Sequence, residues 1–193
     1  MLKTSSYLFL ILILLSCKRD TQEHQLHEAL KLYYSQDQID ELLLVKSHFE
    51  NYVVQGLNLK SSKKENIYKA YNNHLSKYEY EGDLKVPFEQ SIKFQVSDMI
   101  SPELASDIWI NPENFKESFT NANYNLDGKY WKMLGDYRNT NDMIDKYLLI
   151  YQQTGDLSPS LVAGFIKGSQ AQDFKQALFQ LFVAMHYVSL NKF

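Results

Sequence analysis

The sequence predicts an all-α protein, an irregular multi-helix bundle built around a buried C-terminal helix. Apolar residues recur at intervals of three and four along most of the chain, which is the period of one helix face. Capping patterns led by serine stand in front of several of these runs. The 193 residues include only seven glycines and four prolines, too few for the many tight turns of an all-β protein. We therefore expect about seven to nine helices, several of them short.

The first third of the chain predicts three helices. The first covers residues 22–34. The second covers residues 35–56, opens with the capping pattern of Ser35 and Gln38, and ends at a glycine. The third covers residues 62–78 and begins with a second capping pattern, Ser-Lys-Lys-Glu. Each carries leucine, isoleucine or aromatic residues at helical spacing, so each should present one apolar face to a core.

The middle of the chain is less regular. Residues 86–100 fit a helix through Phe88, Ile92 and Val96, but Ile92, Phe94 and Val96 also alternate as in a strand. Helical neighbours favour the helix. Two short helices should follow, because Ser-Pro-Glu at 101–103 and Asn-Pro-Glu at 111–113 each supply a cap, a proline at the first helical position and an acid in the first turn.

The last third predicts a loop over residues 120–128, then helices over 130–138 and 139–153, then a short helical turn from Ser158-Pro159. The final helix is predicted over residues 169–190. Ten of the twelve residues from 177 to 188 are apolar, and a helix that is apolar nearly all round is buried among others. Twelve residues span only about 18 Å, so this is a core helix and no membrane span.

The first seventeen residues have a different character. Lys3 precedes nine consecutive apolar residues, 7–15, and Leu-Leu-Ser-Cys at 14–17 then leads into the polar Lys18. A basic start, an apolar stretch of this length and a small residue at the cut are typical of a secretory signal. Nine apolar residues are too few for a spanning helix, which needs about 20.

The ending of this segment resembles the lipobox of bacterial lipoproteins. The resemblance covers only the first seventeen residues, and it implies that Cys17, the only cysteine in the chain, is lipidated and becomes the first residue of the mature protein. The expected division is a signal peptide over 1–16, a lipidated cysteine and tether over 17–22, and a helical domain over 23–193. The membrane is then a partner through the anchor at Cys17.

The same resemblance implies a place in the cell envelope. Lys18 follows the cysteine, where an aspartate can retain lipoproteins in the inner membrane of some bacteria. Where a cell has two membranes, we therefore expect the outer one.

Composition argues against some partners. Removal of residues 1–16 takes one lysine and leaves a net charge of −4, against −3 for the whole chain. Nucleic acid would call for a basic face, so it is not an expected partner. With no cysteine beyond position 17, the domain has no disulfides and must be stabilised by a packed core, to which 14 tyrosines and 11 phenylalanines can contribute.

No catalytic residue, cofactor or metal site is predicted. The chain has no GxSxG elbow, phosphate loop or GxGxxG motif. His24 and His27 stand three apart but have no third ligand near them in sequence, and His186 lies in the buried helix, where a hydrogen-bonded core histidine is the common case. Asn-Tyr-Asn-Leu-Asp-Gly at 123–128 resembles the start of a calcium loop, but a leucine replaces the glutamate at its twelfth position.

Aromatic residues and asparagines concentrate between residues 109 and 137. Loops that carry tryptophan and tyrosine are where recognition energy usually concentrates. We therefore expect a contact surface for a ligand or protein partner here, formed by Trp109, Tyr124, Tyr130 and Trp131. The alternative is that these rings pack in the core while the asparagines serve turns.

Two functions remain open from the sequence. The first is a non-catalytic envelope lipoprotein that binds an unidentified protein partner or assists assembly, which the tether and the missing catalytic motifs favour. The alternative is an envelope hydrolase or metal-dependent enzyme without a recognisable motif.

Overall fold

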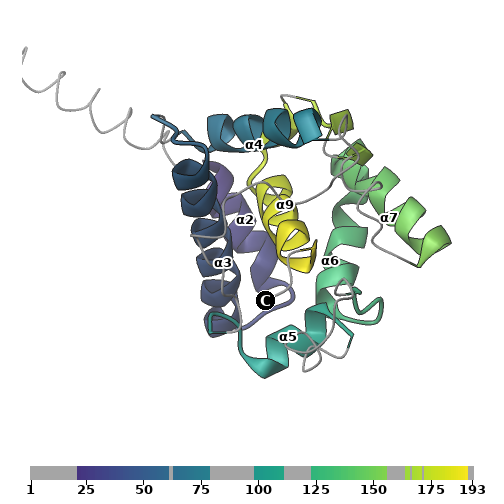
Figure 1. Ribbon diagram of the computed structural model, residues 1–193. Helices are drawn as coiled ribbons and strands as arrows, with labels where there is room; N and C mark the ends of the chain where they lie inside the picture. The colour runs from purple at the N-terminus through teal and green to yellow at the C-terminus, as the bar shows by residue number, and fades with distance from the viewer. Residues whose placement is uncertain are drawn as a thin grey trace, which may run out of the picture.

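The fold is an all-α bundle, as the sequence predicts. The computed structural model describes residues 21–60, 63–78, 98–110, 123–155, 164–165, 167–170 and 172–190. These residues form seven α-helices, two 3₁₀ turns and one isolated β-bridge. Figure 1 shows the C-terminal helix in the middle, with α2 and α3 on one side of it and α6 and α7 on the other. In the part of the chain that is described, no helix is both long and apolar enough to cross a membrane.

The bundle begins with an antiparallel pair, α2 (Thr21–Lys31) and α3 (Gln36–Gly56). The predicted capping pattern is confirmed, because the Gln38 backbone N–H donates to Ser35 Oγ and the Ser35 backbone N–H donates to Gln38 Oε1 at 3.2 Å. These reciprocal bonds satisfy two backbone donors that the first turn of a helix leaves unpaired.

The third helix, α4 (Lys64–Tyr78), runs across one end of the bundle (Figure 1). Its buried face holds Tyr68 and Tyr71, whose ring centroids lie 5.7 and 5.1 Å from that of Phe49 on α3. The serine predicted to cap α4, at position 62, lies outside the described residues.

Two short helices follow, α5 (Pro102–Ile108) at the other end and α6 (Lys129–Tyr137) along the side of the bundle, in contact with both α5 and α7. The predicted start of α5 is confirmed, with Ser101 as the cap and a proline at the first position. The start of α6 is capped from a distance, because Asp107 Oδ1 accepts from the Lys129 N–H at 2.7 Å. Gly128 is required at this junction, since a Cβ there would lie 1.8 Å from the Asp107 carbonyl oxygen.

The next helix, α7 (Asp142–Thr154), begins three residues after the predicted start at 139 and ends one residue after the predicted end at 153. Asn141 caps it by accepting from the N–H groups of Met143 and Ile144 at 2.9 and 3.2 Å. Gly155 ends it with a φ of 66°, a left-handed conformation that glycine adopts without steric cost. A 3₁₀ turn at Arg138–Thr140 joins α6 to α7.

The C-terminal helix, α9 (Ala177–Leu190), is the core of the bundle. Residues 179–189 are all buried, and the helix contacts both α2 and α3. Its predicted start at Ser169 is wrong, because a 3₁₀ turn, η5 (Asp173–Lys175), and the extended Gln176 precede it. Asp173 turns the chain here, since its carboxylate accepts from the Gln170 N–H at 2.6 Å and from the distant Asn141 Nδ2 at 3.2 Å.

Two predicted elements are not tested, and a third, the short helix expected from residues 158–159, is described only at its end, where residues 164–165 and 167–168 are helical. The short helix expected from residues 111–113 lies outside the described residues. So do residues 86–97 of the segment that fits either a helix or a strand, and residues 98–100 form a turn and a bend.

Candidate functional site

The predicted lipid anchor lies outside the described residues, but the first helix that the structure describes follows it closely in sequence. The first described helix starts at Thr21, so three residues separate it from Cys17. Four extended steps of chain reach at most about 14 Å. A lipid on Cys17 would therefore hold the α2 end of the body close to the bilayer.

The predicted aromatic contact surface is corrected by the structure. The four side chains of that prediction are buried, with exposed fractions of 2% for Trp109, 1% for Tyr124, 1% for Tyr130 and 6% for Trp131. They lie together as part of the core, since the ring centroid of Tyr124 is 5.8 Å from those of both Tyr130 and Trp131. Rings buried at this level cannot form the first contact with a ligand or protein.

Backbone pairing explains why these rings turn inward. Trp109 and Tyr124 form an antiparallel bridge, in which the Ile110 N–H donates to the Asn123 carbonyl at 2.9 Å. The bridge directs both rings toward α7 and α9, where the Trp109 Nε1–H donates to Ser189 Oγ at 2.8 Å. The Tyr151 hydroxyl accepts from the Tyr124 N–H at 2.9 Å.

The segment that resembles a calcium loop is a turn that leads into α6. Asn125 Oδ1 accepts from the Asp127 N–H at 3.1 Å, and Asn125 Nδ2 donates to the Ser106 carbonyl at 3.0 Å. Both ends of this side chain are therefore used to shape the turn, as is common for asparagine.

The histidines do not gather into a metal site in the described part of the chain, where no three His, Cys, Asp or Glu side chains cluster to hold an ion. His24 is exposed, and His27 Nε2 lies 3.2 Å from Gln36 Nε2. His186 is fully buried, with its Nδ1 2.9 Å from the Tyr147 hydroxyl. Burial lowers the pKa of His186 to about 3, so its imidazole is neutral in the core.

This buried histidine predicts acid destabilisation. Below pH 6.5, the usual pKa of a histidine, the unfolded chain binds a proton at His186 that the native protein does not bind. The free energy of unfolding should therefore fall by about 1.4 kcal/mol per pH unit as the pH drops below that value. Urea unfolding between pH 7 and about 5 measures the slope, above the range in which most carboxylates titrate.

His186→Gln tests whether His186 causes this pH dependence of the free energy of unfolding. The glutamine retains polar groups near the Tyr147 hydroxyl. This variant should unfold more easily at neutral pH but lose less stability on acidification. The matched control is His24→Gln at an exposed position. A slope reduced equally in both variants would contradict the assignment to His186.

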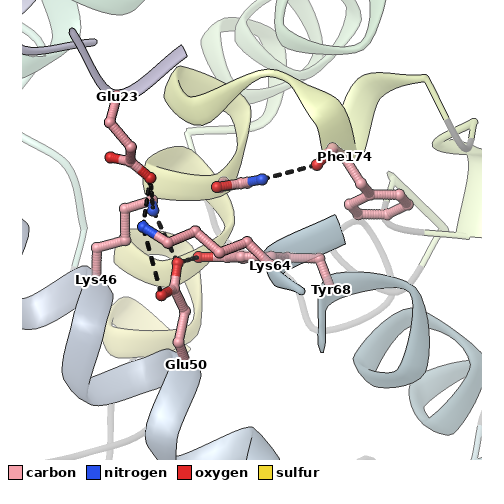
Figure 2. A network of polar contacts seen from close by, with 7 residues as sticks. Glu23, Lys46, Glu50, Lys64, Tyr68 and Phe174 are labelled. Atoms are coloured by element: carbon pink, nitrogen blue, oxygen red, sulfur yellow. Dashed lines mark hydrogen bonds and ion pairs between the residues drawn. The ribbon is translucent and has the colours of Figure 1, made fainter. Parts of the chain in front are cut away.

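The most distinctive polar feature is a cluster of charges between α2, α3 and α4, which we call the lysine–glutamate network (Glu23, Lys46, Glu50, Lys64 and Tyr68). The Lys46 ammonium lies 2.7 Å from Glu50 and 3.0 Å from Glu23. Lys64 contacts Glu23, and lies 3.9 Å from Glu50. Figure 2 shows the two ammonium groups between the two carboxylates, with the Tyr68 hydroxyl directed at Glu50.

The network is buried at its centre and balanced in charge. Lys46 is 2% exposed and Glu50 is 8% exposed, whereas Glu23 and Lys64 lie nearer the surface. Burial acts to raise the pKa of Glu23, but hydrogen bonds and charges from Lys64 and Lys46 outweigh it, and the pKa is lowered. Burial and the neighbouring Glu50 raise the pKa of Tyr68 well above its usual value. These shifts favour the ionised form of the Glu23 carboxyl and the protonated form of the Tyr68 hydroxyl.

Sequence reasoning missed this network, although α3 carries a signal for it. Leu42, Phe49 and Val53 define the buried face of the helix, and Lys46 stands four residues after the first of them. A lysine within an apolar face and a glutamate four residues later form a pair at helical spacing. The partners on α2 and α4 could not be deduced, because they are distant in sequence.

A polar depression of about 270 Å³ lies between the start of α7 and η5. Its lining includes Asn141, Asp173 and Gln176, and the Asn141 Nδ2 donates to Asp173 at 3.2 Å and to Gln176 at 3.1 Å. The same asparagine caps α7. These polar groups thus join α7 to the chain before α9, and they are already engaged with one another.

Comparison of the chain with protein-family models, with curated proteins and with solved structures finds no match.

Proposed function

We propose that this protein is a lipid-anchored protein of the bacterial cell envelope whose helical body binds a protein partner or assists assembly and performs no catalysis. The observation that carries the anchor is the Leu-Leu-Ser-Cys sequence at 14–17, which ends an apolar stretch and contains the only cysteine of the chain. Lys18 at the next position favours the outer membrane where a cell has two.

The non-catalytic part of the proposal is supported by how the ionisable groups are used. Lys46 and Glu50 pair with each other at 2.7 Å in the interior. His186 is buried beside Tyr147, and its pKa is lowered to about 3. This pKa is too far below neutral pH for an efficient general acid or base. Asn141 and Asp173 bond to each other at the wall of the polar depression. In each place the groups stabilise the fold.

Substitution of the cysteine tests the anchor. Cys17→Ala should abolish lipidation. The protein should then either keep its signal peptide or be released from the membrane fraction, because stable anchoring requires several acyl chains and this variant carries none. Cell fractionation and the intact mass of the purified protein measure the result.

The matched control is Ser16→Ala, which keeps a small residue before the cysteine and should leave processing unchanged. A Cys17→Ala protein that still fractionates wholly with membranes and starts at residue 17 would contradict the proposal. Crosslinking and pull-down from native membranes then tests the binding role. Recovery of no partner, together with a measurable hydrolytic activity, would overturn it.

A further inference from the structure

The polar depression between the start of α7 and η5 has at its floor a carboxylate whose bonds within the fold are all to neutral groups. Asp173 is 9% exposed. Its two oxygens accept from the Asn141 Nδ2 at 3.2 Å and from the Gln170 N–H at 2.6 Å. Among the described residues, no lysine or arginine forms an ion pair with it. Buried charges are usually paired with an opposite charge, so this carboxylate favours a cation as a further partner.

The depression has acceptor sites that the fold does not use. An ionised carboxylate has about four lone-pair sites, and the two printed bonds of Asp173 use one on each oxygen. Asp142, exposed in the first turn of α7, adds a second carboxylate to the lining, and its side chain makes no bond to the described residues. A positively charged group can therefore bind here without breaking the bonds that hold Asp173 in place.

The charge of the lining also favours a cation. Asp142 and Asp173 are negative and Lys146 is positive, and no other residue of the lining is charged, so the net charge is −1. Lys146 is exposed, and it forms no ion pair with either acid. Lys167 and Lys175 lie close in sequence but are not part of the lining. An anion would meet two carboxylates here and a single lysine.

The size of the depression suits the end of one long side chain. Its volume is about 270 Å³, below the roughly 300–1,000 Å³ of pockets that enclose a whole small molecule. The side-chain amides of Gln170, Gln172 and Gln176 add oxygen acceptors to the lining, which the N–H donors of lysine and arginine can use. Gly168 keeps one wall open, because a Cβ there would lie only 3.1 Å from Met143 Cε.

From this carboxylate, this charge and this size we propose that the depression binds a basic side chain, lysine or arginine, of the protein partner. The inference rests on the proposed binding function and names the chemistry that the partner presents. The ammonium or guanidinium group bonds to the Asp173 carboxylate at the floor and to Asp142 at the rim. Lys146, on the same lining, weakens this binding by repulsion between like charges.

Small probes test the site on the full chain in a non-ionic maltoside detergent. N-acetyl-lysine methylamide and N-acetyl-arginine methylamide carry the two cations, and N-acetyl-norleucine methylamide is the matched neutral probe. With ¹⁵N-labelled glutamine, the backbone N–H groups of Gln170, Gln172 and Gln176 report from the lining, and that of Gln55 in α3 reports from elsewhere. Both cationic probes should shift the three lining signals saturably at millimolar concentration and leave Gln55 unchanged. The neutral probe should shift none of them.

Substitutions at the rim should change the affinity in opposite directions. Asp142→Asn should weaken the binding of both cationic probes several-fold, and Lys146→Gln should strengthen it several-fold, because the two residues differ in the sign of their charge. Both residues are exposed, so both variants should fold, which circular dichroism checks. Asp145→Asn, on α7 but outside the lining, is the matched control and should leave the affinity nearly unchanged. Asp173→Asn should abolish binding.

Crosslinking and pull-down from native membranes test whether the cation belongs to the partner. Recovery of the partner should fall with Asp142→Asn and with an excess of the arginine probe, and it should not fall with Asp145→Asn. If the probes bind but the recovery ignores these changes, the depression binds a free cation, and the partner's side chain is overturned as its source.

The other outcomes separate the site from the proposed function. If neither cationic probe shifts the lining signals while the partner is still recovered, the site is overturned and the binding function stands. Equal shifts with the neutral probe would overturn the choice of a cation. If the wild type recovers no partner, the proposed function and the partner as the source of the cation both fail, and the probe shifts alone decide whether the site binds a cation.

Discussion

Phe182→Asp should unfold the helical body. Phe182 is fully buried in α9, and its ring centroid lies 4.8 Å from that of Tyr147 and 5.2 Å from that of Phe165, in edge-to-face contacts. A carboxylate at this position would be an unpaired buried charge, which costs several kcal/mol even after the protein relaxes. The lost aromatic packing adds about 3–5 kcal/mol. Together these losses approach the total stability of an ordinary domain, about 5–15 kcal/mol.

The control for this prediction is the same change of chemistry at the surface. Leu181 is also fully buried on α9, whereas Leu149 on α7 is 49% exposed. Leu181→Asp should therefore abolish the cooperative unfolding transition and Leu149→Asp should leave it nearly unchanged. Circular dichroism and thermal melting of the chain from residue 18 onward measure both. A Phe182→Asp protein with an unchanged melting temperature would mean that α9 is not the core.

The central position of α9 could be predicted because the evidence for it is local. A helix that is apolar on every side has no surface to offer water, whatever its neighbours are. The caps at Ser35 and Ser101 could be predicted for the same reason, since each side chain bonds to a backbone N–H three residues further on. Such features depend on a few consecutive residues.

The start of α9 was predicted wrongly because it depends on a distant residue. Ser169 and Gln172 form a capping pattern in the sequence, but Asp173 is bonded to Asn141, 32 positions earlier. The same Asn141 Nδ2 holds Gln176. This contact fixes a 3₁₀ turn where a continuous helix would otherwise run, and a local pattern carries no information about it.

The aromatic segment failed as a predicted contact surface for a related reason. Trp109, Tyr124 and Trp131 are amphipathic, so their composition suits either an interface or a core. The bridge between Trp109 and Tyr124 and the bond from Trp109 to Ser189 on α9 decide for the core. Both are long-range contacts, and the second spans 80 positions.

The lysine–glutamate network leads to the second large expected effect. Lys46→Met keeps most of the volume and the apolar stem of the side chain but removes its charge. Glu50, 8% exposed, then loses its partner at 2.7 Å and retains Lys64 at 3.9 Å. Removal of one member of a buried ion pair usually costs about 3–5 kcal/mol, because the remaining charge is left uncompensated. The melting temperature should fall by about 10 °C for a chain of this size.

A matched ion pair on the neighbouring helix provides the control. Glu65 and Lys69 on α4 are also four residues apart, but their side chains are 34% and 37% exposed. Lys69→Met should lower the stability far less than Lys46→Met does, because exposed pairs on one helix contribute little. The two variants make the same substitution in the same kind of pair, so the difference between them measures burial.

The double variant Lys46→Met, Glu50→Leu tests whether the loss of stability comes from leaving one charge of the pair without its partner. With both charges gone, position 50 no longer holds a carboxylate that has lost its partner, and Glu23 keeps its contact with Lys64. The double variant should therefore be more stable than Lys46→Met alone, because a buried pair replaced by apolar side chains often costs little. Urea unfolding of the wild type, of Lys46→Met, of Glu50→Leu and of the double variant gives the coupling free energy between the two residues. If Lys46→Met lost no more stability than Lys69→Met, the network would not be a buried pair in solution. If the losses of Lys46→Met and Glu50→Leu were additive, the two residues would not act together.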